Sequence, residues 1–164
     1  KMFTFYNPHN NNLYNNLVKL SRNIFFYKDI KLKDDFDTRI ILIFLHFSII
    51  IKKFKKSKFP QELFDNIFQN IEYNLREEGY GDVSVNKKMK ILNKIFYDIL
   101  LKVQKTNSDK FIINNEILIK YLDSKNSNKS NNMGKLSKYF GSFGDFCFEL
   151  DDVNMLKGQI NFKY

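Results

Sequence analysis

Residues 40–51 read IILIFLHFSIII, and this run is the strongest apolar stretch of the 164-residue chain. A helix that crosses a bilayer needs about 20 consecutive apolar residues, so the run is too short to span a membrane. Because its apolar residues surround nearly the whole helix circumference, the run predicts a helix buried on several sides. Asp35 or Asp37 can cap this helix by accepting a hydrogen bond from a free backbone amide. The sequence therefore predicts a central core helix over about residues 37–55.

Apolar residues on both sides of this segment recur at helical spacing. Upstream, alternating steps of four and three fall on Leu13, Leu17, Leu20, Ile24 and Tyr27. Downstream, the same spacing predicts helices over about residues 60–78, 82–103, 111–123 and 133–150. The Gly-Tyr-Gly-Asp turn at residues 79–82 should leave its two flanking helices antiparallel, with Asp82 or Ser84 capping the second. No strand pattern of convincing length is present, so the predicted fold class is all-α, a compact bundle of about five to seven helices around the central helix.

The length and the 43% apolar content are typical of one domain with a substantial core. Residues 1–12 are mostly polar, and we expect a flexible N-terminal tail there, followed by a single helical domain over residues 13–164. Residues 124–132 form a Ser/Asn/Lys tract with the composition of a flexible loop. The last segment, residues 158–164, shows no pattern that assigns it to an element.

The formal net charge is +9, a balance that favours acidic partners such as nucleic acid, anionic lipid or an acidic protein surface. The sharpest charge feature is a basic cluster at the end of the central helix, formed by Lys52, Lys53, Lys55, Lys56 and Lys58. Cations at a helix C-terminus are stabilised by the helix dipole, so a purely structural role is sufficient. The alternative is a patch that docks on an anionic surface.

Residues that catalysis or metal binding would need are scarce in this chain. The histidines are His9, in the polar N-terminal segment, and His46, in the central helix. The residues one turn away from His46 are apolar, so we expect a core histidine that makes one hydrogen bond rather than a metal ligand or a general base. Cys147 is the single cysteine, and its Phe neighbours indicate a small buried hydrophobe. The sequence therefore predicts no enzyme, no metal site, no cofactor and no small-molecule substrate.

Several short motifs follow one another in a characteristic order between Leu13 and Gln104. They are Leu13-Tyr14 with Arg22 and Tyr27, Asp37-Thr38-Arg39, Leu45-His46, Leu63-Phe64-Asp65, Leu75-Arg76-Glu77-Glu78-Gly79-Tyr80-Gly81-Asp82 with Val85, and Phe96-Tyr97. In order and spacing they resemble the bacterial branch of the ubiquinol-cytochrome c chaperone family. The resemblance implies an all-helical assembly factor for the cytochrome bc complex, without enzymatic activity, that binds newly made cytochrome b.

The matching motifs supply the candidate client contacts Arg39, His46, Asp65, Arg76, Glu77, Gly79, Tyr80, Gly81, Asp82 and Tyr97. The stretch from Arg76 to Asp82 also has a structural interpretation. Gly79 can adopt the left-handed conformation that ends a helix, and Arg76 can tie the corner to Asp82 or Asp65. On this interpretation, Asp82 also accepts hydrogen bonds from the free amides of the following helix.

The expected partners are cytochrome b or another nascent membrane protein. The ribosome or an anionic membrane surface is a possible further partner, and we expect no binding to DNA. The N-terminal residues carry neither a secretory nor a transit signal, so we expect a cytoplasmic protein, free or bound peripherally at the inner membrane. The alternative function is a basic helical module for RNA or ribosome binding, with residues 52–58 supplying phosphate contacts. No recognised nucleic-acid motif accompanies that cluster.

Overall fold

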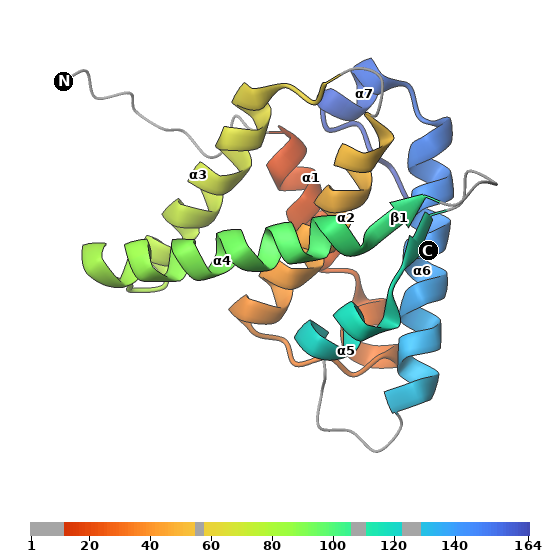
Figure 1. Ribbon diagram of the computed structural model, residues 1–164, viewed down its shortest axis with the longest axis horizontal. Coiled ribbons are helices and arrows are strands. Elements are labelled where there is room, and N and C mark those ends of the chain that lie inside the picture. Colours follow the sequence, from red (N-terminus) through yellow and green to blue (C-terminus); the bar gives the residue numbers. More distant parts are fainter. Residues whose placement is uncertain (1–11, 55–57, 106–110, 123–128) are drawn as a thin grey trace.

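The computed structural model describes residues 12–54, 58–105, 111–122 and 129–164 of the chain. The described residues form seven α-helices, a π-helical turn and a two-stranded sheet (Figure 1). The helices are α1 (Asn12–Ser21), α2 (Phe36–Lys53), α3 (Gln61–Glu77), α4 (Asp82–Lys102), α5 (Asn115–Leu122), α6 (Lys129–Glu149) and α7 (Asp152–Leu156). The π-helical turn η2 is Phe25–Asp29, and the strands are β1 (Val103–Lys105) and β2 (Phe111–Ile113). Apart from Asn12, the expected N-terminal tail lies outside the described residues.

Helix α2 is the axis of the bundle, and α1, α4 and α6 pack around it (Figure 1). Every residue from Ile40 to Ile50 is buried. The helix begins where the sequence predicts, because the Asp35 carboxylate accepts a hydrogen bond from the Thr38 N–H at 2.8 Å. The prediction of an all-α bundle around a central apolar helix is therefore confirmed. Within the described ranges, no helix is both long enough and apolar enough to cross a membrane.

The predicted apolar stripes of α4 and α6 face this axis. In α4 the fully buried positions include Val85, Phe96 and Ile99. In α6 the predicted inward positions are all buried, and they are Leu136, Tyr139, Phe140, Phe143 and Cys147. Residues 159–164 belong to no helix or strand but continue this core, since Ile160 is buried and the Phe162 ring lies 5.3 Å from the Phe143 ring.

The predicted first helix is wrong beyond Ser21. Helix α1 ends there, and η2 follows after a short break, which leaves Ile24 68% exposed instead of buried. Local polar bonds explain the break, because the Asn23 side chain accepts from the Phe25 N–H at 3.0 Å. The Tyr27 hydroxyl then donates to the Ser21 carbonyl oxygen at 2.8 Å and holds the turn against the end of α1.

The sequence prediction also missed the sheet, which replaces the start of the expected 111–123 helix. Strands β1 and β2 pair antiparallel with Val103 opposite Ile113, and both of these side chains are buried. Two β-branched residues directly opposite each other stabilise such a pair. Helix α5 therefore begins only at Asn115.

The start of α6 and the angle between α3 and α4 also differ from expectation. Helix α6 begins at Lys129, so the last residues of the expected 124–132 loop are helical, and the others lie outside the described residues.

Helices α3 and α4 diverge in a V instead of lying antiparallel (Figure 1). This arrangement follows from their packing, since α4 lies against α2 whereas α3 reaches α1.

A candidate client-binding cleft

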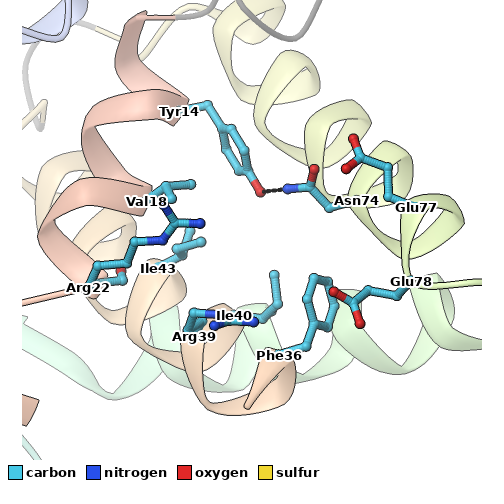
Figure 2. Close-up of a pocket in the computed structure, with 11 residues that line it drawn as sticks. Tyr14, Val18, Arg22, Phe36, Arg39, Ile40, Ile43, Asn74, Glu77 and Glu78 are labelled. Carbon is cyan, nitrogen blue, oxygen red and sulfur yellow. Dashed lines mark hydrogen bonds between the residues drawn. The ribbon is translucent and has the colours of Figure 1, made fainter. Parts of the chain in front are cut away.

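A cleft of about 160 Å³ opens where α1, the start of α2 and the end of α3 meet (Figure 2). It is lined by Tyr14, Val18, Ser21, Arg22, Phe36, Arg39, Ile40, Ile43, Asn74, Glu77 and Glu78. The α1 and α2 side of the lining combines apolar side chains with two arginines, and the α3 side carries two glutamates. A cleft with this composition suits a polypeptide segment that has an apolar face and charged neighbours.

Helical periodicity brings the lining residues of α1 and α2 to one side. Tyr14, Val18 and Arg22 follow at steps of four, so they lie on one face of α1 and continue past its end. The first turns of α2 contribute Arg39 and Ile43 on the face that meets α1. The cleft is therefore a direct consequence of α1 crossing the N-terminal half of the central helix.

The third wall of the cleft is the last turn of α3. Asn74 is anchored there because its side-chain amide donates to the Tyr14 hydroxyl, a bond that ties α3 to α1. Glu77 and Glu78 follow immediately and form the acidic rim (Figure 2). The last turn of a helix presents its free carbonyl groups, so this wall as a whole is electronegative.

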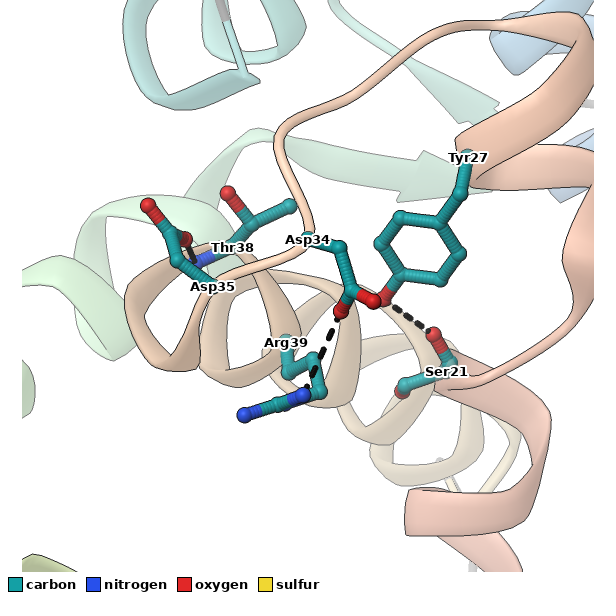
Figure 3. Close-up of polar contacts among 6 residues, drawn as sticks. All are labelled: Ser21, Tyr27, Asp34, Asp35, Thr38 and Arg39. Atoms are coloured by element: carbon teal, nitrogen blue, oxygen red, sulfur yellow. Dashed lines mark hydrogen bonds and ion pairs between the residues drawn. The ribbon is translucent and has the colours of Figure 1, made fainter. Parts of the chain in front are cut away.

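The opposite rim is cationic and is partly held in place. The Arg39 guanidinium lies 3.2 Å from an Asp34 carboxylate oxygen, next to the Asp35 cap (Figure 3). Arg22 is exposed and forms no ion pair with any described residue. Arg22 is thus available to a bound partner, whereas Arg39 would have to share its charge with Asp34.

Tyr27 stands behind this rim, with its hydroxyl pointing toward the end of α1 (Figure 3). Burial, together with the nearby Asp34 carboxylate, raises the pKa of Tyr27 to about 12. The hydroxyl therefore stays protonated at neutral pH and keeps its bond to the Ser21 carbonyl oxygen. Through this bond, Tyr27 holds the segment that connects α1 to α2 against the end of α1.

The structure brings only part of the predicted site residues to this cleft. Arg39 and Glu77 line it. Arg76 and Asp82 pair with each other at the adjoining corner, as the structural interpretation predicts, and Glu72 lies 3.4 Å from the same guanidinium. Asp82 is not the cap of α4, because its side chain is engaged with Arg76 and Gly81 occupies the capping position.

The remaining residues of the corner and two more distant candidates fall outside the cleft lining. Gly79 ends α3 with a φ of 101°, a conformation that favours glycine. Tyr80 and Gly81 continue the exposed turn. Asp65 lies near the start of α3 and accepts a hydrogen bond from the Gln61 side chain at 2.9 Å. Tyr97 is exposed on α4.

His46 is a core residue, so in this structure its side chain offers no surface to a client. The side chain is fully buried, and its Nδ1 lies 2.6 Å from the Leu42 carbonyl oxygen. A carbonyl oxygen only accepts, so Nδ1 carries the proton, and Nε2 accepts from the Tyr139 hydroxyl at 2.8 Å. Burial lowers the pKa of His46 to about 4. Both ring nitrogens are therefore satisfied inside the bundle, one more than expected.

At least one lysine of the basic cluster at the end of α2 is engaged in an ion pair within the fold. Lys53 is only 9% exposed and forms an ion pair with Asp152 of α7 at 3.1 Å. Lys58 is exposed and Lys52 is half-buried. Lys55 and Lys56 lie outside the described residues. Lys53 is thus a structural cation that fixes α7 to the central helix, not a free docking residue.

The described part of the chain holds no group of three or more His, Cys, Asp or Glu side chains that could bind a metal ion. Tyr14, Arg22, Phe36, Asn74 and Glu78 line the cleft but were not among the predicted site residues. They come from three different helices and their ends, and periodicity does not tell which helix ends converge. The available signal was the charged residues that directly adjoin apolar stripes at the ends of α1 and α3.

Comparisons with known proteins agree with this architecture. The family described as Ubiquinol-cytochrome C chaperone matches residues 28–159 of the chain. The fold is similar to the crystal structure of the Cbp3 homolog from Brucella abortus, with a TM-score of 0.68 and 21% identity. That match covers 93% of this chain and 87% of the Brucella protein. Among curated proteins, no match was found.

Proposed function

Because the chain belongs to the ubiquinol-cytochrome c chaperone family, we propose that it binds newly made cytochrome b during assembly of the cytochrome bc complex. The protein acts as a holder, which keeps a hydrophobic subunit in a competent state until further subunits join. Such a role needs a receiving surface and no reactive machinery, and the family membership carries this proposal.

The α1–α2–α3 cleft is the proposed client contact. Its partly exposed apolar residues, Val18 and Phe36, accept the apolar face of a client segment. Its rims carry opposite charges, with Arg22 and Arg39 on one side and glutamates on the other (Figure 2). A segment with an acidic residue beside the arginines and a basic residue beside the glutamates is favoured, and the reverse orientation is disfavoured.

The corner that follows α3 extends the proposed contact. Arg76 and Asp82 form an ion pair across the turn, and Tyr80 presents a partly exposed ring beside it. An amphipathic ring of this kind contributes contact area at a low cost in side-chain entropy. Glu77 would then contact the client directly, while Arg76 and Asp82 would position the turn.

The test of this proposal compares cytochrome b levels in cells with and without the protein. Deleting the gene should lower both spectroscopically detected cytochrome b and the assembled complex, and the wild-type chain should restore both. Normal levels of cytochrome b in the deletion strain would contradict the proposed function.

Two charge-reversal variants then locate the contact. R22E/R39E should fail to restore cytochrome b, because it removes the cationic rim of the cleft. K28E/K135E makes the same change in charge at exposed positions outside the cleft and should restore it. Equal thermal stability of the two variants shows that folding is not the cause. If R22E/R39E restores assembly fully, the client contact lies elsewhere.

A further inference from the structure

The outward face of α4 combines exposed lysines with exposed apolar side chains. This α4 outer face consists of Val83, Lys87, Lys90, Ile91, Lys94, Tyr97 and Leu101, and all of these residues are exposed. Val83 is 68% and Leu101 71% exposed, although both are large apolar residues near opposite ends of the helix. The helix has 21 residues, so it is about 30 Å long. It crosses the front of the molecule in Figure 1.

The lysines of this face carry free charge. Lys87, Lys90 and Lys94 form no ion pair with a described residue. Lys88 provides the contrast, because it lies toward α2 and pairs with Asp37 at 3.0 Å. The positive potential of the outer face is therefore not cancelled by the neighbouring side chains that the structure describes.

The two carboxylates of α4 itself, Asp82 and Asp98, are already engaged. Asp82, at the start of α4, is paired with Arg76. Asp98 accepts from the Lys120 ammonium at 3.0 Å and from the Tyr121 hydroxyl, both of which belong to α5. The two acids thus leave the outer face with a net positive charge that an anionic surface would complement.

The apolar residues on this face distinguish between the possible anionic partners. Single strands of nucleic acid bind through aromatic stacking combined with cations, and Tyr97 is the sole aromatic residue on the outer face. Val83, Ile91 and Leu101 are aliphatic and have no such function on RNA. On an anionic bilayer both kinds of side chain contribute, because binding grows with the apolar area that is buried and with the attraction of basic residues to anionic lipid.

We propose that the α4 outer face docks the protein on an anionic lipid surface, with the lysines at the headgroups and the aliphatic side chains in the interfacial layer. The docking goes beyond the proposed chaperone function and does not depend on any client. It is a different surface from the basic cluster at the end of α2, in which Lys53 is held by Asp152.

The chain contains no tryptophan, so a single introduced Trp reports on one position. We would measure Trp emission of purified L101W while adding vesicles of phosphatidylcholine alone or with one quarter phosphatidylglycerol. Anionic vesicles should shift the emission to shorter wavelength, and high salt should reverse the shift. The matched reporter I24W lies at an equally exposed apolar position on a different element and should show no shift.

Vesicle cosedimentation of charge and apolar variants completes the test. K87Q/K90Q/K94Q should partition on the order of a hundredfold more weakly, because each lysine near an anionic surface contributes about a fivefold factor. V83S/I91S/L101S should lose on the order of tenfold while its charge is unchanged. The control K135Q/K138Q/K157Q removes the same charge from exposed positions on α6 and after α7 and should bind like the wild type.

Several outcomes would overturn the proposal. Binding that is equal for neutral and anionic vesicles, or equally weakened by the control variant, would show that α4 is not the docking face. Binding to a uridine oligonucleotide without any vesicle binding would assign the lysines to RNA. Since no client is present in these experiments, their failure leaves the proposed chaperone function intact.

Discussion

Acidification should destabilise this protein through one buried histidine. His46 carries its proton on Nδ1, which donates to the Leu42 carbonyl oxygen, and its Nε2 accepts from the Tyr139 hydroxyl. A second proton on Nε2 would break the bond from Tyr139 and place an uncompensated charge in an aromatic core. The folded state therefore resists protonation, which is why burial lowers the pKa of His46 to about 4.

The sign and size of the effect follow from linkage. In the unfolded chain His46 takes up its proton near pH 6.5, whereas in the folded chain it does so only near pH 4. The histidine thus contributes stability that is fully present above pH 6.5 and is lost as the pH falls from 6.5 toward 4. The loss in the free energy of unfolding is about 2 kcal/mol at pH 5 and about 3 kcal/mol at pH 4.

The measurement is urea unfolding followed by helical circular dichroism at pH 7 and at pH 5. The comparison protein is H46L/Y139F, in which both partners become apolar, so that no unpaired polar group remains. The wild type should lose about 2 kcal/mol more than this variant between the two pH values. All carboxylates and the other histidine, His9, are common to both proteins and cancel. Equal losses in the two proteins would refute the assignment of the proton and of the lowered pKa.

Other predictions follow from local contacts. D35A should lower the free energy of unfolding by about 1 kcal/mol in urea denaturation, because α2 loses its cap. G158A should cost about 1 to 3 kcal/mol, since Gly158 has a φ of 77° and an added Cβ would lie 2.5 Å from the Asn12 carbonyl oxygen. In contrast, G141A should gain about 0.5 to 1 kcal/mol, because the space beside this helical glycine is open. Burial raises the pKa of the Cys147 thiol, so it should react with a disulfide reagent at pH 8 only after denaturant is added, and fast labelling of the native protein would show that this region opens.

The elements that could be predicted from the sequence are those whose burial is encoded locally. The central helix is apolar all round, and the stripe of α4 repeats without interruption, so both appear where expected. The break after Ser21 was missed because the apolar spacing continues to Tyr27, and only the Asn23 side chain marks the change. The sheet was missed because strands of three residues carry too little pattern to compete with a neighbouring helix.

The site was harder to predict than the fold, for a related reason. Arg39 and Glu77 come from motifs that carry the family resemblance, and both line the cleft. His46 comes from the same motifs but supports the core, because a motif does not distinguish a residue that contacts a partner from one that holds the scaffold. Its partner Tyr139 lies 93 residues away, and no periodicity reaches that far. Arg22 was part of a quoted motif, yet only the crossing of α1 and α2 gives it a role.

The two proposed surfaces are neighbours along the chain, because one short turn connects α3 to α4. Glu78 ends the acidic wall of the cleft, and Val83 begins the α4 outer face only a few residues later. The turn that connects them contains the left-handed Gly79, and the exposed Arg76–Asp82 pair bridges it. A protein docked through α4 would therefore keep the cleft close to the lipid. A membrane protein subunit that has not yet found its partners is exposed at that same boundary, so docking would raise the local concentration of cleft and client together.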